Sequence, residues 1–184
     1  MRKLHVSVDL ETLSVRPDAV ILSIGAVAFL EGADLQMAEF YTPVRIAPQT
    51  GLRNIQPKTL EWWKNKAPAA RTVFEECERH DTPRLGEALQ LLTKWLSTMD
   101  AFDVYMWGNG SSFDIAILEH AFLQWGYEVP WKFHNVRDMR TLKDLTERRG
   151  LYKRIPMEGV AHNALDDARH QAIQIRAMLK AMSL

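Results

Sequence analysis

Residues 6–11 (VSVDLE) constrain the fold more than any other part of this 184-residue chain. Valines alternate with small or acidic residues, a period of two that indicates a β-strand. Because strand side chains alternate between faces, Asp9 and Glu11 project from the same side. Two carboxylates that close repel each other and are costly to bury without compensation. A hard divalent cation would compensate them, although this motif alone leaves open a solvated acidic turn at a strand end.

The length and composition predict one domain that covers residues 1–184. A chain of this size buries roughly 70% of its unfolded surface in one core, and 47% apolar with 25% charged residues is typical of a globular protein. Cys77 is the single cysteine, which excludes an internal disulfide and favours a reducing compartment. We recognise no signal peptide, and the apolar run at 19–30 is shorter than the roughly 20 residues of a membrane helix. We therefore expect a cytoplasmic protein with no membrane partner.

The charges balance overall but not locally. The 23 basic and 23 acidic residues give no net field that would attract nucleic acid. Residues 137–154 nevertheless hold seven basic and three acidic side chains, and residues 75–103 hold the opposite excess. The basic segment fits either a surface that follows a phosphate backbone or an ordinary solvated face, and composition does not separate the two.

The order of the expected elements predicts an α/β domain with a mixed five-stranded sheet. Three strands come first and form an antiparallel meander, and strands then alternate with helices. The strands are expected at 6–10, 20–29, 39–44, 103–107 and 133–136. The helices are expected at 57–66, 84–99, 113–125, 139–148 and 163–182, with loops at 45–56 and 149–161.

Further acidic residues follow the later elements. Asp114 lies in the first turn of a helix, just after the turn Gly108-Asn109-Gly110, and ligands in α/β proteins collect beyond strand ends. Asp166 and Asp167 open the last helix. Acidic residues at helix N-termini are also favoured by the helix dipole alone. Spacing does not tell whether Asp166 or Asp167 is the functional residue.

Taken together, three ordered motifs resemble a known family. They are DLET at 9–12, FD at 113–114, and His162 followed five residues later by Asp167. This arrangement resembles the DEDDh, or DnaQ-like, 3′-to-5′ exonucleases of the ribonuclease H-like superfamily. The strings ILSIGAVAF at 21–29, EWW at 61–63 and RDMRTL at 137–142 are most similar to one branch. That branch comprises small phage and bacterial enzymes related to exodeoxyribonuclease VIII and to mycobacterial exoribonucleases.

The resemblance implies a ribonuclease H-like fold and a hydrolase that removes nucleoside monophosphates from single-stranded DNA or RNA. It implies two Mg²⁺ or Mn²⁺ ions, His162 as general base, and Asp167 rather than Asp166 as the functional acid. The implied metal ligands are Asp9, Glu11, Asp114 and Asp167. The alternative is a binding or scaffolding module of the same fold without catalysis, but all five catalytic positions carry the residues that the family uses.

The pairing of His162 with Asp167 makes a geometric prediction. Five residues of helix correspond to 140° of rotation beyond a full turn. The two side chains therefore converge only if His162 lies outside the last helix.

The resemblance also implies contacts with the 3′-terminal nucleotide. In the family, the backbone and apolar side chains after the first acid hold this nucleotide, which here assigns Leu10, Thr12 and Leu13. Asn109 and Phe113 are placed where a terminal or penultimate base and sugar would rest.

The tandem tryptophans offer a stacking face for a single-stranded base. Adjacent helix positions diverge by 100°, so we expect at most one of Trp62 and Trp63 to face substrate, and we assign Trp63. The expected partners are nucleic acid 3′ ends and a second copy in a homodimer. His134, Asp138 and His170 receive no catalytic role; we expect Asp138 to order the turn before the helix at 139–148.

Overall fold

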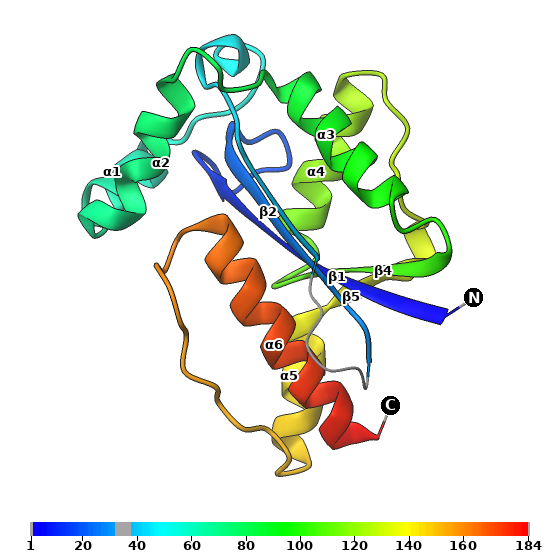
Figure 1. The fold of residues 1–184 in the computed structure, drawn as a ribbon. Helices are drawn as coiled ribbons and strands as arrows, with labels where there is room; N and C mark the ends of the chain where they lie inside the picture. Colours follow the sequence, from blue (N-terminus) through cyan, green and yellow to red (C-terminus); the bar gives the residue numbers. More distant parts are fainter. Residues whose placement is uncertain (1, 32–37, 184) are drawn as a thin grey trace.

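The centre of the fold is a five-stranded sheet with the strand order β3-β2-β1-β4-β5 (Figure 1). The structure is a computed structural model, and it describes residues 2–31 and 38–183. The strands are β1 (Arg2–Thr12), β2 (Ile21–Phe29), β3 (Ala38–Pro43), β4 (Phe102–Gly108) and β5 (Val136–Asp138). Strand β2 pairs antiparallel with β1 and β3, whereas β4 pairs parallel with β1 and β5. The predicted mixed α/β sheet is confirmed.

Helices cover both faces of this sheet. Figure 1 shows α3 and α4 on one side, α5 and α6 on the other, and α1 and α2 beyond the end of β1. The helices are α1 (Pro57–Lys64), α2 (Pro68–Glu78), α3 (Leu85–Ser97), α4 (Asp114–Gln124), α5 (Met139–Arg148) and α6 (Ala164–Met182). Short 3₁₀ turns lie at Ala47–Gln49 and Phe133–Asn135. Within the described ranges, no helix is both long enough and apolar enough to cross a bilayer.

The two faces of β1 have different partners, as its alternating sequence predicts. Val6 and Val8 are fully buried in the cluster that includes residues of α3 and α4. On the opposite face, the Oγ atom of Ser7 donates to Oε1 of Gln171 on α6 at 3.3 Å. Asp9, the next residue on that face, accepts a hydrogen bond from the same glutamine. The strand thus presents its carboxylates to the helix that carries the last acidic motif.

Strand β2 lets α6 approach the sheet closely. All of its residues are buried, as expected for a strand covered on both faces. Gly25 pairs with Asp9 in the register of β1 and β2. A Cβ atom at this glycine would lie 2.2 Å from the backbone carbonyl carbon and oxygen of Ala164, the first residue of α6. The missing side chain therefore makes room for the start of α6 beside Asp9.

Two sequence expectations need correction. The strand expected at 133–136 is a 3₁₀ turn followed by β5, because Asn135 is tied by its side-chain amide to the carbonyl oxygen of Val104 and to Asp103. Helix α2 was not anticipated at all. Its signal was present: Pro68 stands at the first helical position, and Ala70, Val73 and Cys77 recur at helical spacing on its buried side.

Candidate active site

A cavity of about 590 Å³ opens beside the carboxyl end of β1. Its size lies within the usual range for small-molecule sites, and its place at the strand ends is where α/β sheets bind ligands. The lining residues come from β1, α1, α4, α5, α6 and the loops between them. They are Asp9, Leu10, Glu11, Thr12, Val15, Gln56, Lys58, Thr59, Trp62, Asn109, Phe113, Asp114, Arg140, His162, Asp167 and Gln171.

All five residues expected to be catalytic line this one cavity. Asp9 and Glu11 come from β1, Asp114 is the first residue of α4, and Asp167 lies in the first turn of α6. His162 precedes α6. β1, α4 and α6 each have one end at the same edge of the sheet (Figure 1). Residues from opposite ends of the chain therefore converge there.

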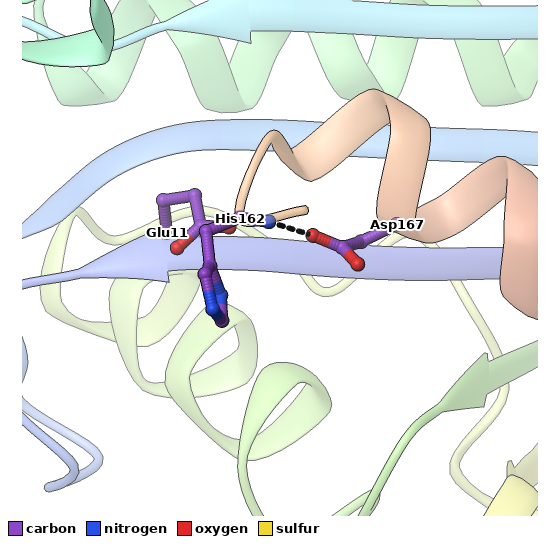
Figure 2. A group of neighbouring side chains, drawn as sticks. All are labelled: Glu11, His162 and Asp167. Carbon is purple, nitrogen blue, oxygen red and sulfur yellow. Dashed lines mark hydrogen bonds between the residues drawn. The ribbon is translucent and has the colours of Figure 1, made fainter. Parts of the chain in front are cut away.

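His162 lies outside the helix, so the geometric prediction is confirmed. Asn163 caps α6, its Oδ1 atom accepting from the amides of Leu165 and Asp166, and the helix begins at Ala164. His162 adopts a φ of 67°, a left-handed conformation that is uncommon outside glycine. This turn brings its amide within 2.7 Å of a carboxylate oxygen of Asp167, to which it donates (Figure 2).

Glu11, His162 and Asp167 form a compact donor group. One nitrogen or oxygen atom from each lies within 4.8 Å of the others, and Figure 2 shows the three side chains converging from β1, the loop before α6, and α6 itself. Carboxylate oxygen with one imidazole nitrogen is a donor set that divalent cations accept.

The other two acids are fixed by hydrogen bonds. The Oδ1 atom of Asp114 accepts from the backbone amide of Leu10 at 3.1 Å, which ties the start of α4 to β1. Asp9 accepts from Nε2 of Gln171 at 2.7 Å. Gln171 was not anticipated from the sequence, but its signal was its position four residues after Asp167, on the same face of α6.

The carboxylates hold their protons unusually strongly. Burial raises the pKa of Asp9 well above its ordinary value, and the charges of Asp114, Glu11 and Asp167 raise it further. Burial, followed by repulsion from Asp167 and Asp114, raises the pKa of Glu11 to about 8. Burial raises the pKa of Asp114 to about 7, opposed by hydrogen bonds from the backbone of Leu10, of Asp114 itself and of Asn109, and burial also raises the pKa of Asp167. The chain thus gathers buried carboxylates whose unfavourable environment is offset only in part by its own cations, Lys66 near Glu11 and Arg140 near Asp114.

Asp166 and Asp167 point to different surroundings. The carboxylate of Asp166 accepts from the amide of Val160 at 2.8 Å and from Arg169 at 2.5 Å. Arg169 in turn pairs with Glu39 on β3 at 2.8 Å. Asp166 therefore holds the preceding loop and β3 against α6, whereas Asp167 lines the cavity. This difference supports Asp167 as the functional acid.

The expected nucleotide contacts divide into two groups. Leu10, Thr12, Asn109 and Phe113 line the cavity. Leu13 does not, because its side chain is buried in the cluster beneath α1 and α2, which also includes residues 20 and 22. The structure thus places the Leu13 side chain outside the cavity, whereas the prediction puts it in contact with substrate.

The assignment of Trp63 as the stacking residue is also corrected. Trp63 is 2% exposed, and its indole Nε1 donates to the carbonyl oxygen of Thr12 at 2.9 Å. Trp62 is 41% exposed and lines the cavity. The sequence correctly limited the cavity to one of the two tryptophans, but α1, with eight residues, is too short for its phase to be read from the pattern.

Two basic residues of the cavity were not anticipated as site residues. Arg140, in the first turn of α5, reaches back over the glycine turn, and its Nε atom donates to Oδ1 of Asn109 at 3.4 Å. Its signal was its place in the basic segment 137–154. Lys58 lies at the start of α1 and had no distinguishing signal. Asp138 orders the turn between β5 and α5 as expected, accepting from the amides of Ser111 and Thr141 at 2.6 and 2.8 Å.

The chain is similar in structure to several solved exonucleases. The nuclease domain of 3′hExo, a DEDDh family member bound to rAMP, matches with a TM-score of 0.63 and 16% identity over 96% of this chain and 92% of that chain. Exonuclease X in complex with 5′ overhanging duplex DNA matches with a TM-score of 0.57 and 16% identity over 98% and 93%. The E. coli ExoI–ssDNA complex matches with a TM-score of 0.62 and 12% identity, over all of this chain and 42% of that one. No curated protein sequence matches significantly.

These likenesses show that the chain shares the fold of solved exonucleases, among them a DEDDh family member. The comparison of the sequence with protein families is more specific than the structural likeness. Residues 4–179 match the family described as the 3′-5′ exoribonuclease Rv2179c-like domain, and the chain belongs to this family. The protein is thus a 3′-to-5′ exonuclease, and the resemblance inferred from its motifs is confirmed.

Proposed function

We propose that this exonuclease hydrolyses phosphodiester bonds from the 3′ end of single-stranded nucleic acid and releases nucleoside monophosphates. The observation that carries the proposal is the convergence of Asp9, Glu11, Asp114 and Asp167 with His162 in one cavity large enough for a nucleotide. The description of the family supports RNA as the preferred substrate. Single-stranded DNA is the competing substrate, since a sequence-independent grip on a strand end relies on phosphate contacts and stacking with either sugar.

The four carboxylates fit a pair of Mg²⁺ or Mn²⁺ ions. They supply hard oxygen donors, and their raised pKa values reflect burial and, for Asp9 and Glu11, mutual repulsion that added cations would relieve. Asp9, Glu11, Asp114 and Asp167 would hold these ions. When bound, such a pair lowers the pKa of water and stabilises the attacking and leaving oxygens of a phosphodiester.

His162 is placed to act as the general base. Burial lowers the pKa of its imidazole, and the nearby charge of Lys66 lowers it further, against the opposing effect of Asp167. The ring is therefore neutral near pH 7 and able to take the proton of the attacking water. Asp167 holds the backbone of His162 in place through the amide hydrogen bond.

The reaction is tested by incubating 5′-labelled single-stranded RNA and DNA with the protein and Mn²⁺. We expect a ladder that shortens from the 3′ end, faster on RNA, and that disappears with Asp9→Ala. Intact substrates, with a folded protein that binds Mn²⁺, would contradict the proposal. Faster loss of DNA would overturn the substrate preference alone.

The metal-free protein is expected to lose stability as the pH rises from about 4.5 to 8. The unfolded carboxylates release their protons near pH 4, whereas the folded state keeps protons on Glu11 up to about pH 8 and on Asp114 up to about pH 7. Folding thus takes up protons in this window, and stability falls as they are removed. Thermal unfolding in EDTA at pH 5 and pH 8 measures the fall.

Added Mn²⁺ should reverse this loss. An ion at about 100 times its Kd adds about 2.7 kcal/mol of stability, and the gain should be larger at pH 8, where protons compete less for the carboxylates. The same increase in Tm at both pH values, or none at either, would contradict the assignment of these residues as ligands.

Arg140 is expected to bind a substrate phosphate. Its side chain is exposed, and together with Lys58 it provides basic groups on the wall of a cavity that also presents the four carboxylates. Arg140→Gln should raise KM by roughly 10-fold with little change in kcat, because a hydrogen bond between charged groups contributes about 1.5 kcal/mol or more. The matched control is Arg148→Gln on the same helix, where the arginine pairs with Asp144 outside the cavity. Equal effects of the two substitutions would count against a specific phosphate contact.

We also propose a reducing, cytoplasmic setting and a homodimer as the assembly. Cys77 is buried, and its Sγ atom donates to the carbonyl oxygen of Leu22 at 3.2 Å. Burial raises the pKa of this thiol to about 12, so it serves as a small core group rather than as a nucleophile. Light scattering after size-exclusion chromatography tests the dimer.

A further inference from the structure

The indole of Trp62 contacts both a cation and the proposed general base. The ammonium of Lys66 lies 3.8 Å from the centroid of the Trp62 ring. The imidazole of His162 packs against the same indole with a centroid separation of 4.8 Å and an interplanar angle of 76°, an edge-to-face contact. Such cation–π and aromatic contacts favour one orientation of a ring over the others.

Trp62 is itself held rigidly. Its neighbour Trp63 packs edge-to-face against it at 5.2 Å, and against Phe74 at 5.4 Å. Trp63 also donates to the carbonyl oxygen of Thr12, one residue after Glu11 on β1. The end of α1 is therefore anchored to the strand that carries two of the four acids, and the position of Trp62 follows that of the carboxylates.

The side chain of His162 has few other supports. Its backbone adopts a φ of 67° and is fixed by the amide hydrogen bond to Asp167. This bond does not fix the imidazole ring, whose direction depends on the side chains that it packs against. Within residues 2–31 and 38–183, neither ring nitrogen of His162 makes a hydrogen bond, and the aromatic neighbours of the ring are Trp62 and, at 6.4 Å, Trp63. The orientation of the imidazole thus depends on α1.

The same contacts argue against the role first expected for a tryptophan here. A base that stacks on Trp62 needs a free ring face, yet one face carries Lys66 and the His162 edge contact takes up further ring surface. Stacking would require the ammonium to be displaced. The indole is therefore better placed to support His162 than to receive a base.

We propose that Trp62, fixed by Lys66, is a positioning residue that orients the imidazole of His162 toward the attacking water. This inference rests on the proposed function of His162 as general base. It assigns α1 a role in the chemical step rather than in binding the nucleotide.

Single-turnover and steady-state kinetics of Trp62→Leu and Trp62→Phe on single-stranded RNA test the role. Trp62→Leu should lower kcat by roughly 10- to 100-fold, as expected for a catalytic group displaced by about 1 Å, with KM changed less than about 2-fold. Trp62→Phe keeps an aromatic edge contact and should recover most of the rate. Lys66→Gln should lower kcat only about 3-fold. Leu60→Ala, an exposed position of the same helix outside the cavity, is the control for the integrity of α1.

A second readout does not need activity. In the wild-type protein the Cε1 proton of His162 should show a ring-current shift from the indole, assigned by its loss in His162→Ala. The shift should collapse in Trp62→Leu and persist in Leu60→Ala. An unchanged shift in Trp62→Leu would overturn the contact itself.

The kinetic outcomes separate this inference from the proposed function. A raised KM with unchanged kcat in Trp62→Leu would make Trp62 a stacking platform and overturn the positioning role, as would unchanged kinetics in an active enzyme. An inactive but folded wild-type protein would instead contradict the proposed function, while the ring-current shift would still report whether Trp62 orients His162.

Discussion

Asp9→Asn is expected to reduce exonuclease activity by on the order of 10³-fold or more and, at the same time, to raise the Tm of the metal-free protein at pH 8. A carboxylate that holds the ions contributes several kcal/mol of transition-state stabilisation, and each 1.36 kcal/mol is tenfold in rate. The gain in stability of the metal-free protein comes from the same carboxylate. Asp9 faces the charges of Asp114, Glu11 and Asp167, and a neutral amide removes that repulsion.

The substitution is nearly isosteric, so the two effects are separable from misfolding. The Oδ1 atom of asparagine can still accept the hydrogen bond that Asp9 receives from Gln171. Initial rates with Mn²⁺ and thermal unfolding in EDTA give the two quantities. Asp144 is an exposed acid on α5, and Asp144→Asn serves as the control. It should change neither the initial rate nor the metal-free Tm substantially. An active Asp9→Asn protein, or one with an unchanged metal-free Tm, would refute this account of the site.

The convergence of the acids was predictable because it depends on local rules. A period of two places Asp9 and Glu11 on one face of β1, and the turn after β4 places Asp114 at the start of α4. The ends of parallel strands meet at one edge of the sheet, so these residues approach each other once the strand order is correct. The choice of Asp167 over Asp166 came from resemblance alone, because it depends on contacts with Val160 and Arg169 that spacing does not reveal.

The basic segment shows how a charge run divides in three dimensions. Arg140 lies at the cavity, where it contacts Asn109. Further along α5, Arg148 pairs with Asp144 and Lys143 with Glu147, each four residues apart on one helix face. The segment therefore divides into a part at the cavity, where we propose a phosphate contact, and a solvated part further along α5. Composition could not divide them, since the division depends on which turn of α5 faces the cavity.

The features that the sequence did not reveal are long-range packing contacts. Trp63 is buried in the core, where it packs against Phe74 and donates to the carbonyl oxygen of Thr12, 51 residues earlier in the chain. Phe133 was expected to begin a strand, yet it is 85% exposed in a 3₁₀ turn, because Asn135 rather than the aromatic residue fixes that segment to β4. Propensity is a weak guide where one polar side chain determines the local backbone.

Gly25→Ala is expected to impair both stability and activity, although the glycine touches no substrate. The added Cβ atom would lie 2.2 Å from the carbonyl carbon and oxygen of Ala164 and 2.5 Å from the amide nitrogen of Leu165. These are backbone atoms, so no side-chain rotation relieves the clash and α6 must shift. Overpacking of this kind costs about 3 kcal/mol, which corresponds to a fall in Tm of roughly 10 °C.

The same displacement of α6 should also lower the catalytic activity. His162 and Asp167 flank the residues that would be displaced, whereas Asp9, the partner of Gly25 across the strands, stays with the sheet. A relative movement of about 1 Å between them should lower kcat/KM by roughly 10²-fold, measured at a temperature where the variant is fully folded.

Gly126→Ala separates loss of stability from loss of geometry. Gly126 follows α4 with a φ of 70°, and a Cβ atom added there would meet no other atom within 4 Å. Alanine at this position therefore costs about 1 kcal/mol of backbone strain without displacing α6. Its Tm should fall by a few degrees with kcat/KM unchanged. If Gly25→Ala retained full activity once folded, the close approach of α6 to β2 would be a requirement of stability alone, and the placement of Asp167 would not depend on it.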